Sequence, residues 1–408
     1  MQTIDRLTFS AFGMHAADQI AIVTVPLVAA LVFKASPETI GLLVACQAMA
    51  HLLGSIPFGL VVDRVAAHRV AVAATLISLI GFFGIALSVR LESLIGFAAA
   101  VTFSGFGIVL FVLVSLSILP VITGRNRLAN ANARLELPRA LTTFAVPLAV
   151  GLVFNAGVAE VIFLIATLAA ATAFAGTLGL PRFASPQRSS DNMLKQIVEG
   201  GHFVIRQDLL RPIALCAVFW NFGFAALLVI MVPWLINEVR IDPGAFGIGL
   251  SAFGAATIVG SALSARFADR VSPNLVLLFG PGSSLVAVFA LLLIPTGGSV
   301  WMVGACWFFI GFGPSMWLIA QNSIRQLVTP GAMLGRVNAV IQTAIYGVRP
   351  LGALAGGMIA GATSPTIALA FTVLVFGLSF AAALFSRLRD LRTYNELDPV
   401  TRPVEATV

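Results

Sequence analysis

Long apolar runs separated by short polar segments dominate the chain. A helical run of roughly 20 residues crosses a bilayer core of roughly 30 Å. Because hydrocarbon offers the backbone no hydrogen-bond partner, such runs must be helices or strands of a closed barrel, and their length without period-two alternation excludes the barrel. We expect twelve transmembrane helices at about 7–33, 38–62, 70–89, 93–120, 130–155, 158–180, 211–236, 244–266, 274–295, 299–323, 333–360 and 364–386.

The composition supports a membrane protein. Of 408 residues, 59% are apolar and 10% are charged, against roughly 25% charged residues in a soluble domain. The three cysteines, Cys46, Cys216 and Cys306, lie in apolar runs without a CxxC pair or a histidine at metal-ligand spacing, so we expect packing roles and no metal site. The net charge of +7 could suggest a nucleic-acid partner, but in a membrane protein the position of the charges matters more.

The positions of the basic residues predict the topology. If both termini are cytoplasmic, three of the 24 basic residues, Lys34, Arg90 and Arg240, face outward, and Arg349 lies inside a span. The remaining twenty are then cytoplasmic, which is a strong positive-inside bias. We therefore predict a multi-pass protein of the bacterial inner membrane with both termini in the cytoplasm.

The chain divides into two similar halves. We predict an N-terminal six-helix bundle at 1–180, a cytoplasmic linker at 181–208, a C-terminal six-helix bundle at 209–388 and a cytoplasmic tail at 389–408. A shift of 206 residues superimposes the polar landmarks of the halves. It carries Gly54, Ser55, Asp63, Arg64 and Val65 onto Gly260, Ser261, Asp269, Arg270 and Val271, and Asn132 and Ala133 onto Asn338 and Ala339. Two parallel repeats place a substrate site at the midplane between them.

Residues 192–207 of the linker have the pattern of a short amphipathic helix on the membrane surface. A solvated connector is the alternative, and Pro181 and Pro186 indicate a linker at its start.

The segment from Gly59 to Arg64 resembles the loop motif of the major facilitator superfamily. The stretches from Arg127 to Gly151 and from Gly335 to Gly357 resemble its branch of macrolide-type efflux pumps and enterobactin exporters. The resemblance implies two pseudo-symmetric six-helix bundles, alternating access, and a conformational latch in the loops. The implied latch residues are Gly59, Asp63, Arg64, Asp269, Arg270 and Arg336. Ala66, Ala67 and His68 depart from the glycine and basic residues usual there, so a weaker latch is expected.

Asp18 lies roughly 16 Å into the first span, near the bilayer centre. Placing an ionised carboxylate there costs at least ~2.5 kcal/mol of free energy. The side chain should therefore be paired, face a water-filled cavity, or be protonated for part of the transport cycle. Proton coupling, a structural pairing and binding of a cationic substrate are all open. His15 and Gln19 lie close to Asp18 on the same face of the helix. Arg349 could neutralise Asp18 or attract an anionic substrate, although a structural or gating role is the preferred interpretation.

Other polar and aromatic residues suggest the lining of a substrate cavity. The candidates for substrate binding are His15, Gln19, Ser104, Trp220, Asn221, Phe224, Trp317 and Gln321. Aromatic faces with few polar anchors suit an amphiphilic organic ligand better than a sugar, although each aromatic residue could equally be packing or facing lipid. A basic residue is absent from the fourth span, 93–120, which counts against standard drug/proton antiport.

We predict a secondary active transporter that exports small amphiphilic organic molecules, drug-like or siderophore-like, in exchange for protons bound at Asp18 with Arg349 nearby. The proton gradient would supply the energy without a cofactor, and the partners would be the substrate and membrane lipids, with the protein monomeric. Import or facilitated transport of a small nutrient is the alternative, followed by a receptor or lipid flippase of the same fold. The sequence has no Walker, HExxH or DDxxD motif, so an enzyme is not expected.

Overall fold

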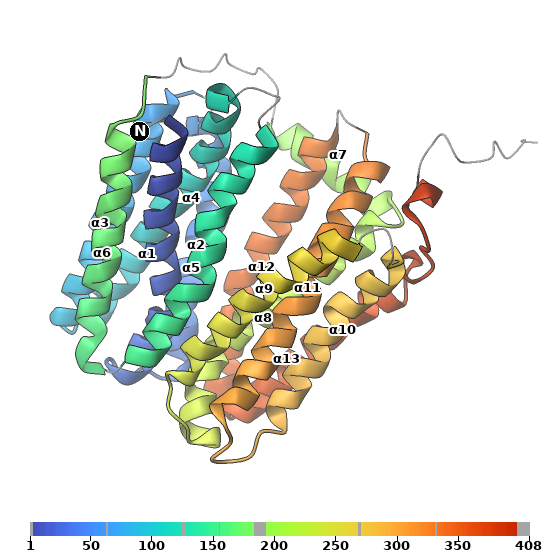
Figure 1. The fold of residues 1–408 in the computed structure, drawn as a ribbon. Helices are drawn as coiled ribbons and strands as arrows, with labels where there is room; N and C mark the ends of the chain where they lie inside the picture. Colours follow the sequence, from blue (N-terminus) through green and yellow to red (C-terminus); the bar gives the residue numbers. More distant parts are fainter. Residues whose placement is uncertain are drawn as a thin grey trace, which may run out of the picture.

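The computed structural model describes residues 3–62, 64–123, 128–154, 156–182, 193–267, 271–330 and 333–397. Two bundles of six long helices lie side by side (Figure 1). The first bundle contains α1 (Thr3–Leu31), α2 (Pro37–Val62), α3 (Ala67–Arg90), α4 (Leu94–Thr123), α5 (Leu128–Val153) and α6 (Ala159–Leu178). The second contains α8 (Leu210–Trp234), α9 (Ala245–Phe267), α10 (Pro273–Leu292), α11 (Val300–Val328), α12 (Leu334–Ala362) and α13 (Pro365–Leu384).

The described residues thus confirm the prediction of twelve long helices. Nine of the helices found there are long and apolar enough to cross a membrane by length and composition. The other three, α2, α5 and α12, have 26, 26 and 29 residues, which is also enough to span a bilayer. Helices α2 and α12 pack against each other, and α5 packs against α9, across the contact between the two halves.

The backbone repeats the internal symmetry of the sequence. The loop after α1 has Lys34 in the left-handed conformation with φ of 49°, and the loop after α8 has Arg240 there with φ of 59°. Positive φ is uncommon in residues with a Cβ, and these two positions are related by the same 206-residue shift. A five-residue π-helix, Leu235–Val239, links α8 to Arg240.

Two close helix crossings join the halves, α2 with α12 and α5 with α9. At the first, a Cβ on Gly41 would lie 3.0 Å from Gly357 Cα and 2.8 Å from the carbonyl oxygen of Ala353. At the second, a Cβ on Gly247 would lie 2.6 Å both from Gly151 Cα and from the carbonyl oxygen of Pro147. The 206-residue shift carries one crossing onto the other, residue by residue. Both crossings therefore need a glycine where the backbones meet.

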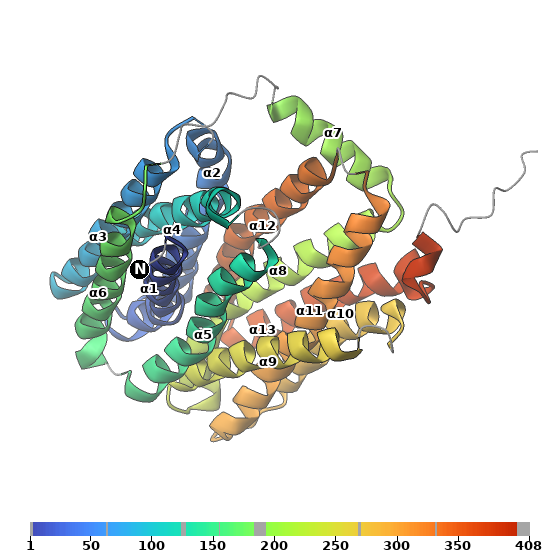
Figure 2. The same ribbon diagram turned by 45° about the horizontal axis from the view of Figure 1, so that its top comes forward.

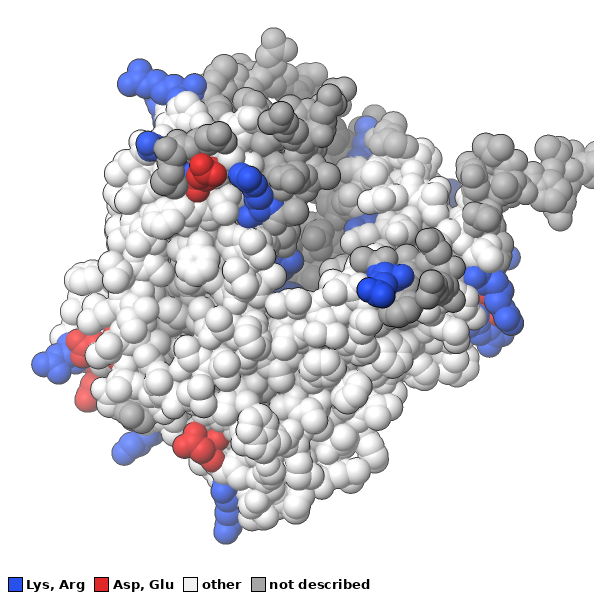
Figure 3. Space-filling model, viewed as in Figure 1, with Lys and Arg blue, Asp and Glu red and all other residues white. Residues whose placement is uncertain are grey.

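The crossings lie near one end of the molecule, at the start of α2 and α9 and the end of α5 and α12. We call this the far end, and the opposite end, where α1 begins, the linker end. Figures 1 and 2 show the two bundles converging at the far end and diverging at the linker end. The space-filling view in Figure 3 shows the surface hollowed between them on the linker side. The structure is therefore a state that is closed at the far end and open at the linker end.

The linker contains a helix, α7 (Met193–Arg206), that packs against the side of α12 at the linker end, as Figure 2 shows. Val204 joins Val337 and Ile341 of α12 in a small apolar cluster. Glu199 accepts a hydrogen bond from Arg336 Nη1 at 2.5 Å and forms an ion pair with it. The opposite face of α7 carries Ile205, which is 64% exposed, so α7 is attached to the protein through one face only.

The first part of the predicted C-terminal tail also packs on the C-terminal bundle. Two short 3-10 helices, Arg387–Arg389 and Tyr394–Leu397, follow α13. Leu388 and Leu391 are buried in an apolar cluster with residues of α8, α10 and α11. This segment is therefore part of the folded bundle through residue 397, and residues 398–408 lie outside the described residues.

Replacing Gly247 by alanine is expected to open the far end. The added methyl group would overlap backbone atoms, and overpacking of this kind costs about 1–3 kcal/mol. At about 1.4 kcal/mol per tenfold change, the balance between the two states should shift by roughly one to two orders of magnitude. Spin labels on cysteines replacing Leu91 and Leu293, both exposed near the far end, would report a longer distance in a background without the three native cysteines.

Gly41→Ala should act in the same direction as Gly247→Ala because it disturbs the symmetry-related crossing. Gly304→Ala is the control, since a Cβ there would have no neighbour within 4 Å. Equal distance distributions for Gly247→Ala and Gly304→Ala would contradict the proposed role of the crossings.

Glu199→Gln is expected to loosen α7. The ion pair is partly exposed, so its loss should cost no more than about 1 kcal/mol, which corresponds to up to about fivefold faster hydrogen exchange in residues 193–206. Asp390→Asn, which removes an exposed ion pair between neighbouring residues, is the control. The double exchange Glu199→Arg with Arg336→Glu should restore protection, and unchanged exchange in Glu199→Gln would show that apolar packing alone holds α7.

Candidate functional site

Asp18 lies near the middle of α1 and is half-buried. The preceding residue, Ala17, is fully buried, whereas His15, Asp18 and Gln19 are each only half-buried. Among the described residues, the carboxylate of Asp18 has no direct hydrogen bond or ion pair. His15 and Gln19 are half-buried on the same part of the helix, as the predicted polar stripe requires. His15 makes an interaction of its own within the fold.

Arg349 lies in α12 and is held by Asn221 of α8. Its Nε and Nη2 both donate to Asn221 Oδ1, at 3.0 Å and 2.8 Å. Asn221 is only 8% exposed, and its own amide donates to the carbonyl oxygen of Ala217 at 2.9 Å. That second bond fixes which end of the amide faces the guanidinium. Arg349 is therefore anchored within the C-terminal half by a neutral group.

Charged and aromatic groups from both halves meet around Arg349. Asp18 on α1 and His51 on α2 are close enough to interact with it electrostatically, but no direct ion pair joins Asp18 to Arg349. The ring of Tyr346 lies 5.7 Å from the guanidinium carbon of Arg349 and 5.4 Å from the ring of His51. Helices α1 and α8 also touch across the interface. The group therefore spans the two halves, and a relative movement of the halves changes its electrostatic energy.

An aromatic cluster includes the residue that precedes Asn221 on α8. Trp220, next to Asn221 in the chain, stacks on Phe224 with ring centroids 4.9 Å apart. Its indole nitrogen donates to Ser284 Oγ at 3.0 Å. Phe224 continues the cluster to Phe253 and Trp307, with ring centroids 5.2 Å and 6.0 Å away. Of the predicted binding residues, Asn221 thus contacts Arg349, and Trp220 and Phe224 lie on the same helix, α8, in an aromatic cluster of the C-terminal half.

The remaining predicted binding residues are not part of this group. Ser104 lies in the contact between α3 and α4, where its hydroxyl donates to the carbonyl oxygen of Val101 at 2.9 Å. Trp317 is buried against Gly280 of α10. Gln321 is 4% exposed and donates to Asn322 on the same helix at 2.6 Å. Helix packing accounts for the surroundings of all three side chains.

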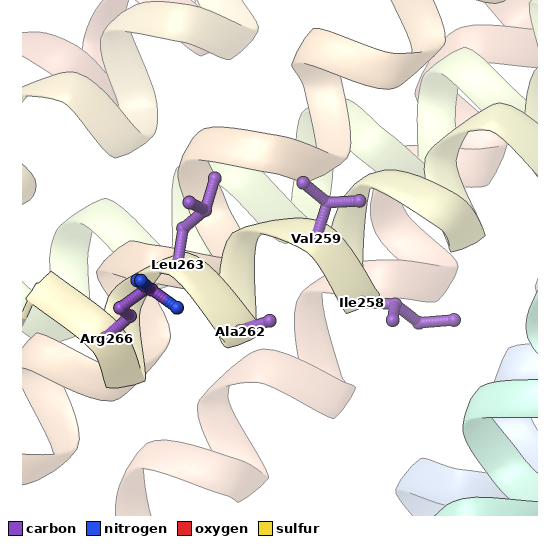
Figure 4. Close-up of a pocket in the computed structure, with 5 residues that line it drawn as sticks. All are labelled: Ile258, Val259, Ala262, Leu263 and Arg266. Atoms are coloured by element: carbon purple, nitrogen blue, oxygen red, sulfur yellow. The ribbon is translucent and has the colours of Figure 1, made fainter.

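A cavity of about 660 Å³ lies elsewhere, along the linker half of α9 (Figure 4). It is lined by Ile258, Val259, Ala262, Leu263 and Arg266. Ile258 and Val259 are each 42% exposed, and the groove is apolar apart from Arg266 at its end. None of the predicted binding residues lines it. The described residues also contain no cluster of histidine, cysteine and acidic side chains that could hold a metal ion.

The sequence model of the major facilitator superfamily matches residues 7–347 and 213–404. The chain belongs to this superfamily. It is 26% identical over 366 residues to the enterobactin exporter EntS of Citrobacter koseri, covering 88% of this chain and 86% of the relative. The same protein of Escherichia coli O1:K1 is 25% identical over the same length. The chain is a transporter of this superfamily and not an enzyme.

Solved structures of other superfamily members share the fold. A nucleoside transporter, NupG, superimposes with a TM-score of 0.75 at 12% identity, covering 94% of this chain and 98% of that one. A bacterial homologue of the iron transporter ferroportin, in an inward-facing state, superimposes with a TM-score of 0.74 at 11% identity, covering 94% and 98%. At these identities the likeness concerns the fold alone.

The predicted latch of this superfamily member is described only in part. Gly59 lies in α2, and Arg64 follows α2 as an exposed residue whose backbone N–H donates to the carbonyl oxygen of Val61 at 3.1 Å. Asp63, Asp269 and Arg270 lie outside the described residues. Arg336 is paired with Glu199 of α7. In this state, therefore, Glu199 forms an ion pair with one of the predicted latch residues. The sequence analysis did not select Glu199.

His51 and Tyr346 are further residues that the sequence analysis missed. His51 and Gln47 are polar residues four apart inside the apolar run 38–62, which places them on one helix face, and this spacing was the available signal. Tyr346 precedes Arg349 by three residues and so shares its face of α12. The contact between the two rings crosses the interface, and a sequence pattern within one helix does not contain it.

Asn221→Leu is expected to destabilise the protein by about 1–3 kcal/mol, because the partly buried guanidinium of Arg349 loses its acceptor. The control is Asn338→Leu, since the buried Oδ1 of Asn338 has no hydrogen-bond partner among the described residues. Thermal unfolding of the purified protein in detergent measures both. A melting temperature of Asn221→Leu that equals or exceeds that of Asn338→Leu would contradict the anchoring role of Asn221.

Proposed function

We propose that this superfamily member exports small amphiphilic organic molecules, drug-like or siderophore-like, from the bacterial cytoplasm by alternating access in exchange for protons. Asp18 would carry the proton, with Arg349 as its counter-charge. The two halves would rock about their interface, exposing the central site first to one side of the membrane and then to the other.

The observation that carries the proposal is the position of Asp18 relative to Arg349. A carboxylate in the middle of a membrane-spanning helix, half-buried and without a direct partner among the described residues, is available to a proton from the open side. Its electrostatic attraction to Arg349 acts across the interface between the halves. Protonation removes that attraction, so it can bias the balance between the open and closed states.

The distribution of charge supports an orientation with the linker end in the cytoplasm. Lys34, Arg90 and Arg240 lie at the far end, where α1, α3 and α8 with its π-helical extension end. The described basic residues at the helix ends on the other side, Arg64, Arg69, Arg206, Arg266, Arg336 and Arg387, lie at the linker end, which fits the positive-inside rule. In this orientation the structure is open to the cytoplasm, which is the state in which an exporter loads its substrate.

Two observations support the substrate class. The stack of Trp220 and Phe224 beside the polar group of Asn221 and Arg349 offers flat apolar surfaces next to a few polar anchors, as an amphiphilic ligand requires. The relatives that cover most of the chain are named as enterobactin exporters, which favours export and a siderophore-like molecule over import of a nutrient. We propose further that the protein works as a monomer in the inner membrane, without a cofactor.

Asp18→Asn should abolish proton-driven transport. In proteoliposomes with an acidic lumen, proton efflux should drive uptake of a substrate from a panel of lipophilic drugs and siderophore-like molecules. The variant should retain at most exchange that does not depend on the gradient, because the amide cannot carry a proton. Asp5→Asn is the matched control, since it removes a carboxylate of the same helix that pairs with Arg134 at the linker end.

Gradient-driven uptake of equal rate in Asp18→Asn and the wild type would exclude Asp18 as the coupling residue. Accumulation in the direction of proton flow, instead of against it, would indicate import by symport. Transport by the wild type that does not depend on the proton gradient would indicate a facilitator.

A further inference from the structure

The guanidinium of Arg349 is fixed in place without being neutralised. Both of the hydrogen bonds that it makes to described residues go to the oxygen of a neutral amide, Asn221, and that amide is itself fixed by the carbonyl oxygen of Ala217. The two bonds to Asn221 involve Nε and Nη2, so other N–H donors of the guanidinium are not engaged by Asn221. The positive charge and several donors of Arg349 therefore remain available on the side away from Asn221.

A buried cation in a membrane needs a negative partner, because leaving it unpaired is costly. Among the described residues, the carboxylate that interacts electrostatically with Arg349 is Asp18, which belongs to the other half and makes no direct ion pair with it. The other titratable groups nearby are His51, Tyr346 and, beside Asp18, His15. None of these supplies a negative charge near neutral pH, so the counter-charge of Arg349 is incomplete in this state.

Aromatic side chains lie on both helices that hold the pair of Arg349 and Asn221, Tyr346 on α12 and Trp220 and Phe224 on α8. The Tyr346 ring lies beside the guanidinium, and the Trp220 and Phe224 stack starts from the residue that precedes Asn221. Arginine is suited to such a place because its planar fork binds carboxylate, phosphate or sulfonate oxygens in pairs while its face packs on aromatic rings.

We propose that Arg349 binds an anionic group of the transported molecule, whose apolar body lies on the Trp220 and Phe224 stack. This inference rests on the proposed function and narrows its substrate class to anionic amphiphiles. The substrate supplies a direct counter-charge to Arg349, and it competes with the carboxylate of Asp18 for the same cation. The inside-negative membrane potential then favours outward movement of the substrate charge.

Asn221→Asp is the most selective test, because it keeps Arg349 and the shape of the site while placing a carboxylate on the guanidinium. An internal ion pair should then replace the substrate anion. Arg349→Gln removes the cation outright, and Arg349→Lys keeps the charge without the planar fork. Arg325→Gln is the matched control, since Arg325 is also held by an asparagine, Asn322, inside a long helix but outside this group.

The full-length protein in lipid nanodiscs would be titrated with two fluorescent probes of the same skeleton, anionic 8-anilinonaphthalene-1-sulfonate and neutral N-phenyl-1-naphthylamine, with empty nanodiscs subtracted. Asn221→Asp and Arg349→Gln should weaken binding of the sulfonate at least about tenfold and leave the neutral probe within about twofold. Arg349→Lys should lie between them, and Arg325→Gln should match the wild type. Asp18→Asn should bind the sulfonate more tightly, because the competing carboxylate is gone.

Equal losses for both probes in Asn221→Asp would overturn the proposal, as would sulfonate binding that survives Arg349→Gln. Melting temperatures within a few degrees of the wild type show that the variants are folded. If only the charge selectivity fails, while both probes bind in nanodiscs and the proteoliposome assay still shows gradient-driven transport, the exporter function stands without an anion site. If the wild type binds neither probe, the amphiphile-exporting function fails together with this inference.

Discussion

The contact on which this structure depends is the pair of glycine crossings between the halves. Gly247 meets Gly151, and Gly41 meets Gly357, at distances that leave no room for a Cβ. In lipid, such contacts are held by close packing and not by the expulsion of water. Because both crossings lie toward the far end, they join the halves there and leave the linker end open. A loss of fit at either crossing is therefore expected to weaken the closure of the far end.

The closed far end has an electrostatic consequence at the midplane. It brings the helices that carry Asp18 and His51 to the helices that carry Arg349 and its anchor Asn221. The opposite charges attract across the interface without direct contact, so the attraction depends on how the halves are placed. Anchoring the arginine with a neutral amide keeps its charge available.

The linker adds a second constraint at the open end. Helix α7 packs on the side of α12, and Glu199 holds Arg336 there. The sequence predicted a short amphipathic helix in this segment, but not what it would contact. Arg336 stood in the sequence analysis as part of the loop latch, and in this open state its partner belongs to the linker. Because the pair is partly exposed, breaking it should cost little free energy.

The sequence by itself determined the twelve helices, their approximate ends, the two-fold repeat and the polar residue at the centre of α1. These features depend on hydrophobic runs and on a fixed offset of 206 residues, which are local or periodic properties of the chain. Only the tertiary structure decided that Asn221 holds Arg349, that His51 and Tyr346 join them, and that Ser104, Trp317 and Gln321 lie in helix contacts. These outcomes depend on which faces of distant helices meet. A membrane helix that is apolar nearly all round carries little information about that choice, because lipid and protein neighbours are almost equally apolar.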